Sequence, residues 1–402
     1  MKLLCFLLLP ITLAAQNLPG LVHDRNIQST FSIIAFDPRT EEWGIAVATN
    51  NLAVGASTCY IRPGIGAFSL IAETAPAYAE NGFRLLAEGK TPEEAVSFTR
   101  KTDSMAQERQ VAGIDARGNV FAFTGSALRY WKGLSAHRTG KGYAAMGNQL
   151  APAVLDRMAE AFEMSNGSLA ERLLAALLAG EKAGGQINGK QSAALLVKGS
   201  RHEWFQDIDL RVDHSPQPFA DLRKLLDYYQ GRVLVNQATF AAKNGNAGRA
   251  RVLLREATRK TTGWYGMYGR LAKIHWMLGE SERARSVLLT ALRAEPKWKE
   301  NLPAFYGLYD RAFRGIFPER KFTLTDWNMA IDMLTDVGQA EKALRLAEQV
   351  IARHPDAAQT WFLRAVAATR AGQKSKAREW AEKALSIDPE HAGAADILSS
   401  LP

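Results

Sequence analysis

A fixed period of 34 in the sequence organises the second half of this 402-residue chain. Four similar segments begin with a glycine: GNAGRARVLLREA at Gly245, GESERARSVLLTALRAEP at Gly279, GQAEKALRLAEQVIARHP at Gly338 and GQKSKAREWAEKALSIDP at Gly372. The first two glycines are one period apart, as are the last two, and the inner gap of 59 equals one period plus 25. A fixed period of this length predicts stacked copies of one supersecondary unit.

Each segment has the periodicity of an amphipathic helix. The apolar stripe of the third segment comprises Ala343, Leu344, Ala347, Val350 and Ile351. The leading glycine suits the left-handed position that ends a preceding helix. A helix–turn–helix unit of this length with small residues at the crossing points resembles the tetratricopeptide repeat. The resemblance covers about residues 233–401 and implies an all-α array over 233–402 that binds a protein or another ligand. An inserted helix is expected within 297–322.

The front part has a different pattern. The β-rich runs TFSIIAF from Thr30 and GIAVATN from Gly44 flank the turn-like PRTEE and predict a hairpin. Further strands are expected at 54–61, 66–72, 110–115, 119–124, 192–198 and 208–212. Helices are expected at 77–88, 92–101, 152–164, 169–182 and 219–229. Hairpins, then helices, then strands again favour an α+β domain over 30–232 with antiparallel sheets, not a doubly wound parallel sheet.

The first residues, MKLLCFLLLPITLAAQN, have the pattern of a secretory signal peptide over 1–15. Lys2 precedes a short apolar run, and small residues end at Ala15, where a peptidase would cut. No later stretch is apolar enough to predict a transmembrane segment. We therefore expect a periplasmic or secreted protein with a leader segment at 16–29. Cys59 is then the one cysteine left, and its strand-like surroundings predict a buried, unreactive thiol.

The net charge of +9 is unevenly placed. Residues 1–232 hold 24 basic and 23 acidic side chains, whereas residues 233–314 hold 15 and 6. One interpretation is a solvated helix surface. The other is a site for an anionic partner, and the residues we assign to it are Arg249, Arg251, Arg255, Lys273, Arg283 and Arg285. In an exported protein, an acidic protein, anionic lipid or cell-wall polymer is expected there, and nucleic acid is not.

Several familiar chemistries do not fit. The segment from Gly184 to Lys190 matches the phosphate-loop spacing, but Gln191 stands where Ser or Thr would bind Mg²⁺, and a strand follows instead of a helix. An ordinary turn is the better interpretation. The seven histidines are scattered, so we expect no metal and no cofactor, with an oxygen-ligand site from distant carboxylates left open.

Seven segments of the front part, in order, carry a family resemblance: TFSIIAFDP, NNLAVGA, RPGIGAFS, VAGIDARGNVFAFTG, GKGYAAMGNQL, GKQSAALLV and DLRVDHSPQP. Together they resemble the family catalogued as domain of unknown function 1028, which is placed in the N-terminal nucleophile hydrolase superfamily. The opening hairpin is similar to the start of such hydrolases, including the proteasome β-subunits. The resemblance covers about residues 30–229 and implies a four-layer αββα sandwich.

The resemblance implies a threonine nucleophile. A hydroxyl is weakly nucleophilic at neutral pH, but the α-amine of a first residue, with a pKa of about 7.7–8.0, is a base beside it. Attack on an amide carbonyl gives an acyl-enzyme through an oxyanion that needs hydrogen-bond donors. Thr30 would be this nucleophile. Removal of the signal peptide leaves the segment 16–29 ahead of Thr30, so a free amine requires a second cut after Ser29, and related hydrolases make such a cut themselves.

Four further residues receive roles by analogy. Asn50 would orient the amine, and Asn148, in an expected GNQ turn, would donate to the oxyanion. Arg62 would lower the pKa of the amine and bind an anionic substrate group. Glu73 would bind a substrate ammonium or transfer a proton. Each residue has a structural alternative, a hydrogen bond or an ion pair within the fold.

Three functions remain open at this point. The first is an exported amidohydrolase that acts on a small amide or peptide and carries a binding repeat domain. The second is a non-catalytic envelope scaffold or adaptor in which the array binds a partner and the front domain is inactive. The third is a component of a surface assembly. The substrate, the ligand of the array and the oligomeric state, including a homo-oligomer, are left open.

Overall fold

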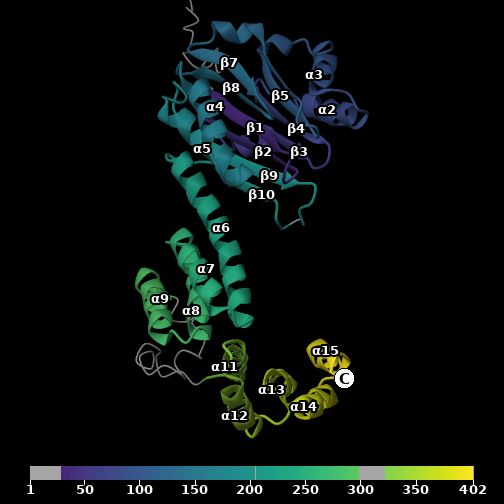
Figure 1. Ribbon diagram of the computed structural model, residues 1–402, viewed down its shortest axis with the longest axis vertical. Helices are drawn as coiled ribbons and strands as arrows, with labels where there is room; N and C mark the ends of the chain where they lie inside the picture. The colour runs from purple at the N-terminus through teal and green to yellow at the C-terminus, as the bar shows by residue number, and fades with distance from the viewer. Residues whose placement is uncertain (1–28, 204, 298–321, 402) are drawn as a thin grey trace, which may run out of the picture. The chain divides into compact units, whose positions relative to one another are not determined.

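The computed structural model describes residues 29–203, 205–297 and 322–401 (Figure 1). The expected signal peptide, nearly all of the leader segment 16–29 and nearly all of the expected inserted helix lie outside these ranges. The chain divides into two compact units between Leu226 and Asp227. Across the described ranges, every helix is too short or too polar to cross a membrane.

The first unit contains two antiparallel sheets. The six-stranded sheet has the order β10-β9-β2-β1-β8-β7, with β1 at Thr30–Asp37, β2 at Glu42–Thr49, β7 at Leu134–Gly140, β8 at Tyr143–Leu150, β9 at Ser192–Gly199 and β10 at Ile208–Val212. The four-stranded sheet has the order β3-β4-β5-β6, with β3 at Cys59–Arg62, β4 at Gly66–Ala72, β5 at Arg109–Asp115 and β6 at Val120–Thr124. Both sheets are antiparallel throughout, as predicted for an α+β domain.

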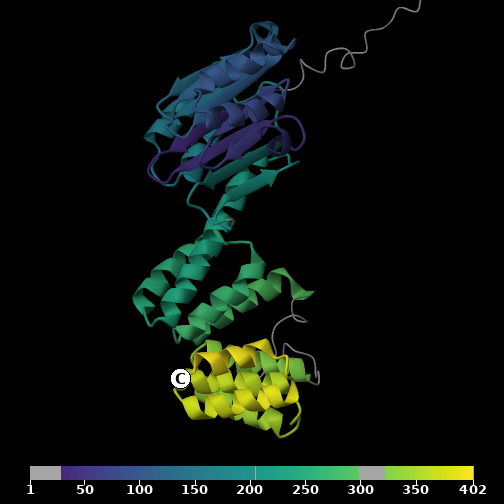
Figure 2. The same cartoon turned by 90° about the vertical axis from the view of Figure 1, so that its right-hand side faces the viewer.

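The sheets pack face to face between layers of helices. Ile34 and Val47 of the larger sheet meet Ala67 and Ile114 of the smaller sheet in one apolar core. The outer face of the larger sheet is covered by α4 (Val154–Met164), α5 (Leu169–Lys182) and the start of α6 (Pro218–Lys243). The outer face of the smaller sheet is covered by α2 (Ala77–Ala87) and α3 (Pro92–Arg100). Figures 1 and 2 show these layers, and because β1 is central, all eight of its residues are buried.

Local differences from the predictions have local causes. Residues 54–57 form a short helix, α1 (Val54–Ser57), and the strand expected at 54–61 begins only at Cys59. The hairpin of β7 and β8 was not predicted, and the expected GNQ turn lies inside β8. Tyr143–Leu150 contains two alanines and a glycine and is buried throughout, so it has neither strong strand propensity nor alternation.

The second unit is helical, as predicted. Beyond α6 it contains α7 (Ala247–Lys260), α8 (Tyr268–Met277), α9 (Ser281–Ala294), α11 (Leu324–Asp336), α12 (Ala340–Ile351), α13 (Ala358–Arg370), α14 (Lys374–Ile387) and α15 (Ala392–Ser400). The repeat glycines Gly245, Gly279, Gly338 and Gly372 all adopt left-handed φ values, 74°, 75°, 81° and 74°. Each of these glycines ends a helix. At Gly338, between α11 and α12, the amide of Gln339 donates to the Leu334 carbonyl at 2.8 Å. The predicted stripe on α12 is buried.

Candidate active site

Thr30 begins β1 and lies between two neighbouring strands. Its register partners are Thr49 on β2 and Asn148 on β8. The Thr30 hydroxyl oxygen is 3.0 Å from the Thr49 hydroxyl oxygen, and the Thr30 nitrogen donates to Oδ1 of Asn148 at 3.1 Å. The Thr30 residue is 9% exposed. Thr30 thus lies at the edge of the core, and both its hydroxyl and its backbone nitrogen are fixed by hydrogen bonds.

The orientation of Asn148 is set by Gln110, which is fully buried on β5. Nε2 of Gln110 donates to the backbone carbonyls of Gly147 at 2.9 Å and Ala136 at 3.1 Å, which can only accept. Oε1 of Gln110 therefore accepts from Nδ2 of Asn148 at 2.9 Å, and Oδ1 of Asn148 faces the Thr30 nitrogen. Asn148 is positioned to hold that nitrogen, which differs from the oxyanion-donor role expected from the sequence.

The carbonyl oxygen of Ser29 receives three donors. The Thr49 hydroxyl donates at 2.7 Å, Nε2 of Gln186 at 2.6 Å and the Asn50 backbone amide at 3.3 Å. Oδ1 of Asn50 in turn accepts from the Ser29 amide at 2.8 Å. Donors that converge on one carbonyl oxygen polarise its carbon and stabilise an oxyanion formed there. The peptide bond between Ser29 and Thr30 therefore lies beside the Thr30 hydroxyl, and its carbonyl oxygen is surrounded by donors that could stabilise an oxyanion.

A cavity of about 100 Å³ opens at Thr30. Five of its twelve lining residues bear a hydroxyl group, and Glu73 is the one acidic residue among them. The backbone of Glu73 is anchored because Nη1 of Arg109 donates to its carbonyl at 2.8 Å. The size of the cavity suits a small acyl group and lies well below the range of about 300–1,000 Å³ usual for drug-sized ligands.

Arg62 does not reach this cavity. The register of β3 pairs Arg62 with Gly66 at the turn of the hairpin, whereas Thr58, just before β3, lines the cavity. The Arg62 guanidinium instead lies 4.7 Å from the centre of the Phe83 ring. Of the five residues predicted from the sequence, Thr30, Asn50, Glu73 and Asn148 gather around one site and Arg62 lies apart.

Strained backbone also gathers here. Among the described residues, four that are not glycine have left-handed φ, and three of them adjoin the site: Ala53 at 52°, Ala72 at 63° and Gln149 at 53°. Ala72 lines the cavity, Ala53 lies between two lining residues, and Gln149 follows Asn148. Such conformations cost about 1–2 kcal/mol per residue, and they cluster where a function requires a fixed geometry.

Sequence reasoning missed Thr49, Gln110 and Gln186. Gln186 lies in the segment that mimics a phosphate loop, which is an ordinary loop before β9. The one feature that could have identified Gln110 from the sequence is its polar side chain within a largely apolar strand. Cys59 lies in β3 and is half-buried, less than the sequence predicted. Desolvation raises its pKa to about 12, which keeps the thiol protonated and unreactive.

Most of the basic side chains assigned to an anionic partner pair with carboxylates of the second unit. Arg251 contacts Glu280 at 2.7 Å, as does Arg283 at 3.3 Å. The remaining pairs are Arg285 with Glu282 and Lys273 with Asp336. Arg249 and Arg255 on α7 are exposed and form no ion pair within the described ranges. Burial raises the pKa of Glu280, but hydrogen bonds from Arg251 and His275 outweigh it and lower that pKa to about 2.

An α+β domain with two antiparallel sheets, followed by helical hairpins, defines a two-part protein with a globular front domain and a helical repeat region. The model of the family of unknown function DUF1028 matches residues 30–222, and tetratricopeptide repeat models match 265–297 and 332–392. The chain belongs to the DUF1028 family and carries tetratricopeptide repeats, which are typical of protein binding.

Three solved structures are similar to parts of this chain. Protein SPO2555 from Silicibacter pomeroyi, described by the DUF1028 family model, is 36% identical over 49% of this chain and 84% of its own, with a TM-score of 0.45. MamA from Desulfovibrio magneticus RS-1 is 19% identical over 43% of this chain and 83% of its own, with a TM-score of 0.20. YrrB, a tetratricopeptide repeat protein with an unusual peptide-binding site, is 19% identical over 40% of this chain and 89% of its own, with a TM-score of 0.20. A search of curated proteins finds no match.

Proposed function

We propose that the front domain is an N-terminal nucleophile amidohydrolase with the αββα sandwich of that superfamily. In this proposal the chain cuts its own bond between Ser29 and Thr30 and then uses Thr30 to hydrolyse a small amide. The observation that carries the proposal is the Ser29 carbonyl, which meets three donors while its neighbour Thr30 holds a hydroxyl within 3.0 Å of Thr49.

The self-cleavage begins with addition of the Thr30 oxygen to the Ser29 carbonyl carbon. The Ser29 oxygen gains negative charge as the Thr30 oxygen adds to the carbonyl carbon. The Thr30 proton then passes to the Thr49 oxygen at 3.0 Å, and Thr49 gives its own proton to the Ser29 oxygen at 2.7 Å. When the carbon–nitrogen bond breaks, the Ser29 oxygen releases this proton to the Thr30 nitrogen and the carbonyl forms again. Water hydrolyses the ester between the Ser29 acyl group and the Thr30 oxygen. The products are a Ser29 carboxylate and a Thr30 with a free amine.

The same groups then serve the external reaction. The free amine is a base next to its own hydroxyl, and Oδ1 of Asn148 holds it in place. Departure of Ser29 frees the donors on Thr49, Gln186 and Asn50 for the oxyanion of a substrate. The small cavity with Glu73 in its lining favours a compact substrate that carries an ammonium group.

The proposal places this chemistry outside the cytoplasm. The signal-peptide pattern of residues 1–15 supports export to the periplasm or the medium. The repeat array then supplies a surface for a protein partner, and the exposed Arg249 and Arg255 on α7 favour an acidic one.

A non-catalytic scaffold is the second candidate. The observation that favours it is that the Thr30 nitrogen is an amide while Ser29 precedes it, and an amide nitrogen is no base. In that case the bond after Ser29 stays intact, and the binding surface of the array is the working part.

Covalent labelling separates the two candidates. A β-lactone acylates an activated threonine hydroxyl, so the mature protein should gain one adduct on the peptide that begins with Thr30. Thr30→Ala should gain none, and Thr40→Ala, which alters an exposed threonine at the far end of β1, should label like the wild type. No adduct on the wild type, or equal labelling of Thr30→Ala, contradicts the hydrolase proposal.

A further inference from the structure

A second, larger cavity lies at the opposite end of β1 from Thr30. It has a volume of about 670 Å³ and is lined by three hairpin turns and by the loop between α4 and α5. β1 spans eight residues, so the two cavities are separated by about 20 Å along the strand. The volume falls within the usual range of about 300–1,000 Å³ for small-molecule sites.

The turns are tied to one another. The Phe36 amide, near the end of β1, donates to the Gly142 carbonyl in the turn between β7 and β8 at 2.9 Å. Nε1 of Trp43 on β2 donates to the Asp115 carbonyl at the end of β5 at 3.3 Å. Oδ1 of Asp115 accepts from the Arg117 amide at 2.8 Å and so fixes the turn between β5 and β6. The walls of the cavity are therefore formed in advance of any ligand.

Each of four separate segments contributes one cation to this cavity. The cations are Arg39 from the β1–β2 turn, Arg117 from the β5–β6 turn, Lys141 from the β7–β8 turn and Arg172 from α5. Residues 1–232 hold 24 basic and 23 acidic side chains, so this gathering does not follow from a generally basic surface. The acidic residues in the lining are Asp37 and Glu163, which leaves an excess of two positive charges (four minus two).

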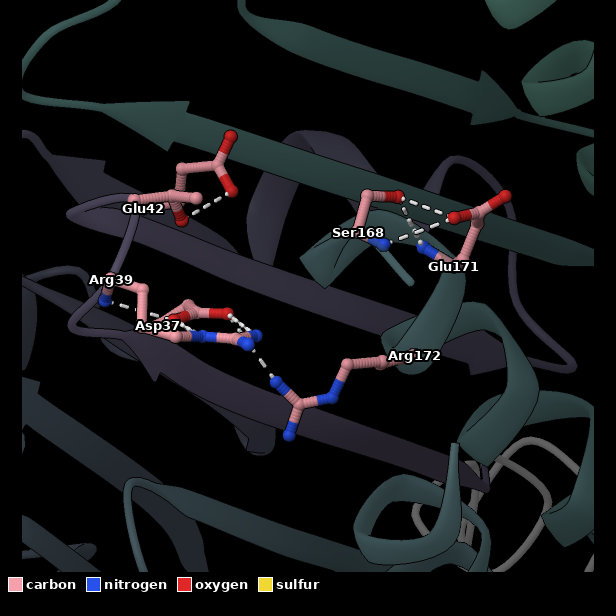
Figure 3. A network of polar contacts seen from close by, with 7 residues as sticks. Asp37, Arg39, Glu42, Ser168, Glu171 and Arg172 are labelled. Carbon is pink, nitrogen blue, oxygen red and sulfur yellow. Dashed lines mark hydrogen bonds and ion pairs between the residues drawn. The ribbon is translucent and has the colours of Figure 1, made fainter. Parts of the chain in front are cut away.

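Asp37 holds two of the cations in place (Figure 3). Its buried carboxylate accepts from Nε of Arg39 at 3.2 Å and from Nη2 at 3.0 Å, and Nη1 of Arg172 lies 3.5 Å away. The Arg39 hydrogen bond is the largest influence and lowers the pKa of Asp37, although burial opposes it. Arg39 uses two of its five N–H donors on this carboxylate, and its side chain remains 76% exposed. Arg172 stacks over the Phe162 ring at 4.2 Å.

The other two cations have no carboxylate partner among the residues that the structure describes. Arg117 and Lys141 are exposed, and neither forms an ion pair within the described ranges. The Glu163 carboxylate is already engaged, because it accepts from the Tyr143 hydroxyl at 2.5 Å. The excess charge of the cavity therefore resides on these two side chains and on the free donors of the two guanidinium groups.

We propose that this cavity is a binding site for a small polyanion that carries two or more phosphate or carboxylate groups. Guanidinium groups fit both kinds of oxyanion through paired N–H donors, and four cations from four directions favour several charged groups over one. Phe36 and Phe162 in the lining add an apolar floor for the ligand skeleton. The site is separate from Thr30 and does not depend on the proposed hydrolase activity.

Titration calorimetry on the full mature protein tests this proposal with two probes, pyrophosphate and propane-1,2,3-tricarboxylate, at constant ionic strength. We expect one saturable site for at least one probe, and the preferred probe identifies phosphate or carboxylate groups as the ligand chemistry. The double variant Arg117→Gln/Lys141→Gln should bind about tenfold more weakly or worse. Both side chains are exposed, so the fold should persist.

The matched control is Arg129→Gln/Lys132→Gln, which also removes one arginine and one lysine charge, but from exposed positions outside the cavity. It should bind like the wild type. The proposal is overturned if neither probe saturates the wild type. It is equally overturned if both double variants lose the same affinity, because binding would then follow net charge and not this cavity.

Discussion

Gln186→Met removes one of the three donors that reach the Ser29 carbonyl oxygen. The hydrogen bond that disappears from that oxygen is the shortest of the three, 2.6 Å from Nε2, and a second bond from Nε2 to the Ser29 hydroxyl oxygen at 3.1 Å is lost with it. The substitution keeps the length of the side chain. The Ser29 oxygen keeps its donors from Thr49 and the Asn50 amide. Oε1 of Gln186 is buried and accepts no hydrogen bond within the described ranges, so its loss offsets part of the cost. The stability of the folded protein should therefore change little.

The rate of self-cleavage should change much more. A hydrogen bond to a neutral carbonyl contributes about 1 kcal/mol, and one to a charged oxygen contributes about 1.5–3 kcal/mol. Only the difference between the two states affects the barrier. Loss of the donor should therefore raise the barrier by about 0.5–2 kcal/mol and slow cleavage roughly 2- to 30-fold.

The assay follows a chain without residues 1–15 as it refolds from denaturant, with samples taken for intact mass spectrometry. Cleavage after Ser29 appears as a fixed loss of mass, and its rate is compared between the wild type and Gln186→Met. Gln217→Met makes the same chemical change at an exposed glutamine and should cleave like the wild type. A Gln186→Met protein that melts at the wild-type Tm and cleaves at the wild-type rate would refute the oxyanion role.

Three further predictions concern the support of the site and the array. Gln110→Met removes a donor from one buried and one partly buried carbonyl and should cost about 2–5 kcal/mol in urea unfolding. Cleavage should slow because Asn148 loses its orientation. Glu280 has its pKa lowered from 4.5 to about 2, so its stabilisation is present above pH 4.5 and is lost as the pH falls toward 2. The difference in unfolding free energy between wild type and Glu280→Gln, about 1–2 kcal/mol at neutral pH, should shrink over that window. Gly338→Ala places a side chain at a φ of 81° and should cost about 1–2 kcal/mol, whereas Gly248→Ala, in open space within α7, should stabilise by about 0.5–1 kcal/mol.

Local patterns were the predictable part of the fold. The repeat period was recognisable because each helical hairpin packs on its sequence neighbours, and the four glycines then fall at left-handed positions. The first hairpin was recognisable because β-rich runs flank a turn. The hairpin of β7 and β8 was not, since a strand buried on both faces and rich in alanine and glycine shows no alternation.

The candidate site divides in the same way. Thr30, Asn50, Glu73 and Asn148 were found from a family resemblance and from their polar character near strand ends. The second set comprises Thr49, Gln110 and Gln186. Thr49 contacts Thr30 across the first hairpin, whereas Gln110 and Gln186 act through contacts between distant parts of the chain. The Gln186 contact with Ser29 joins residues 157 positions apart, and no local pattern reports such a pair. Arg62 was misplaced because the register of β3 is a property of the whole sheet.

The first residue of the mature protein tests the central claim most directly. Protein collected from the medium or periplasm of producing cells is analysed by intact mass and N-terminal sequencing. We predict that the chain begins with Thr30, and that Thr30→Ala retains the segment before it. A wild-type chain that still contains Ser29 would contradict the account, because the nitrogen beside the hydroxyl would then be an amide and the proposed base would be missing.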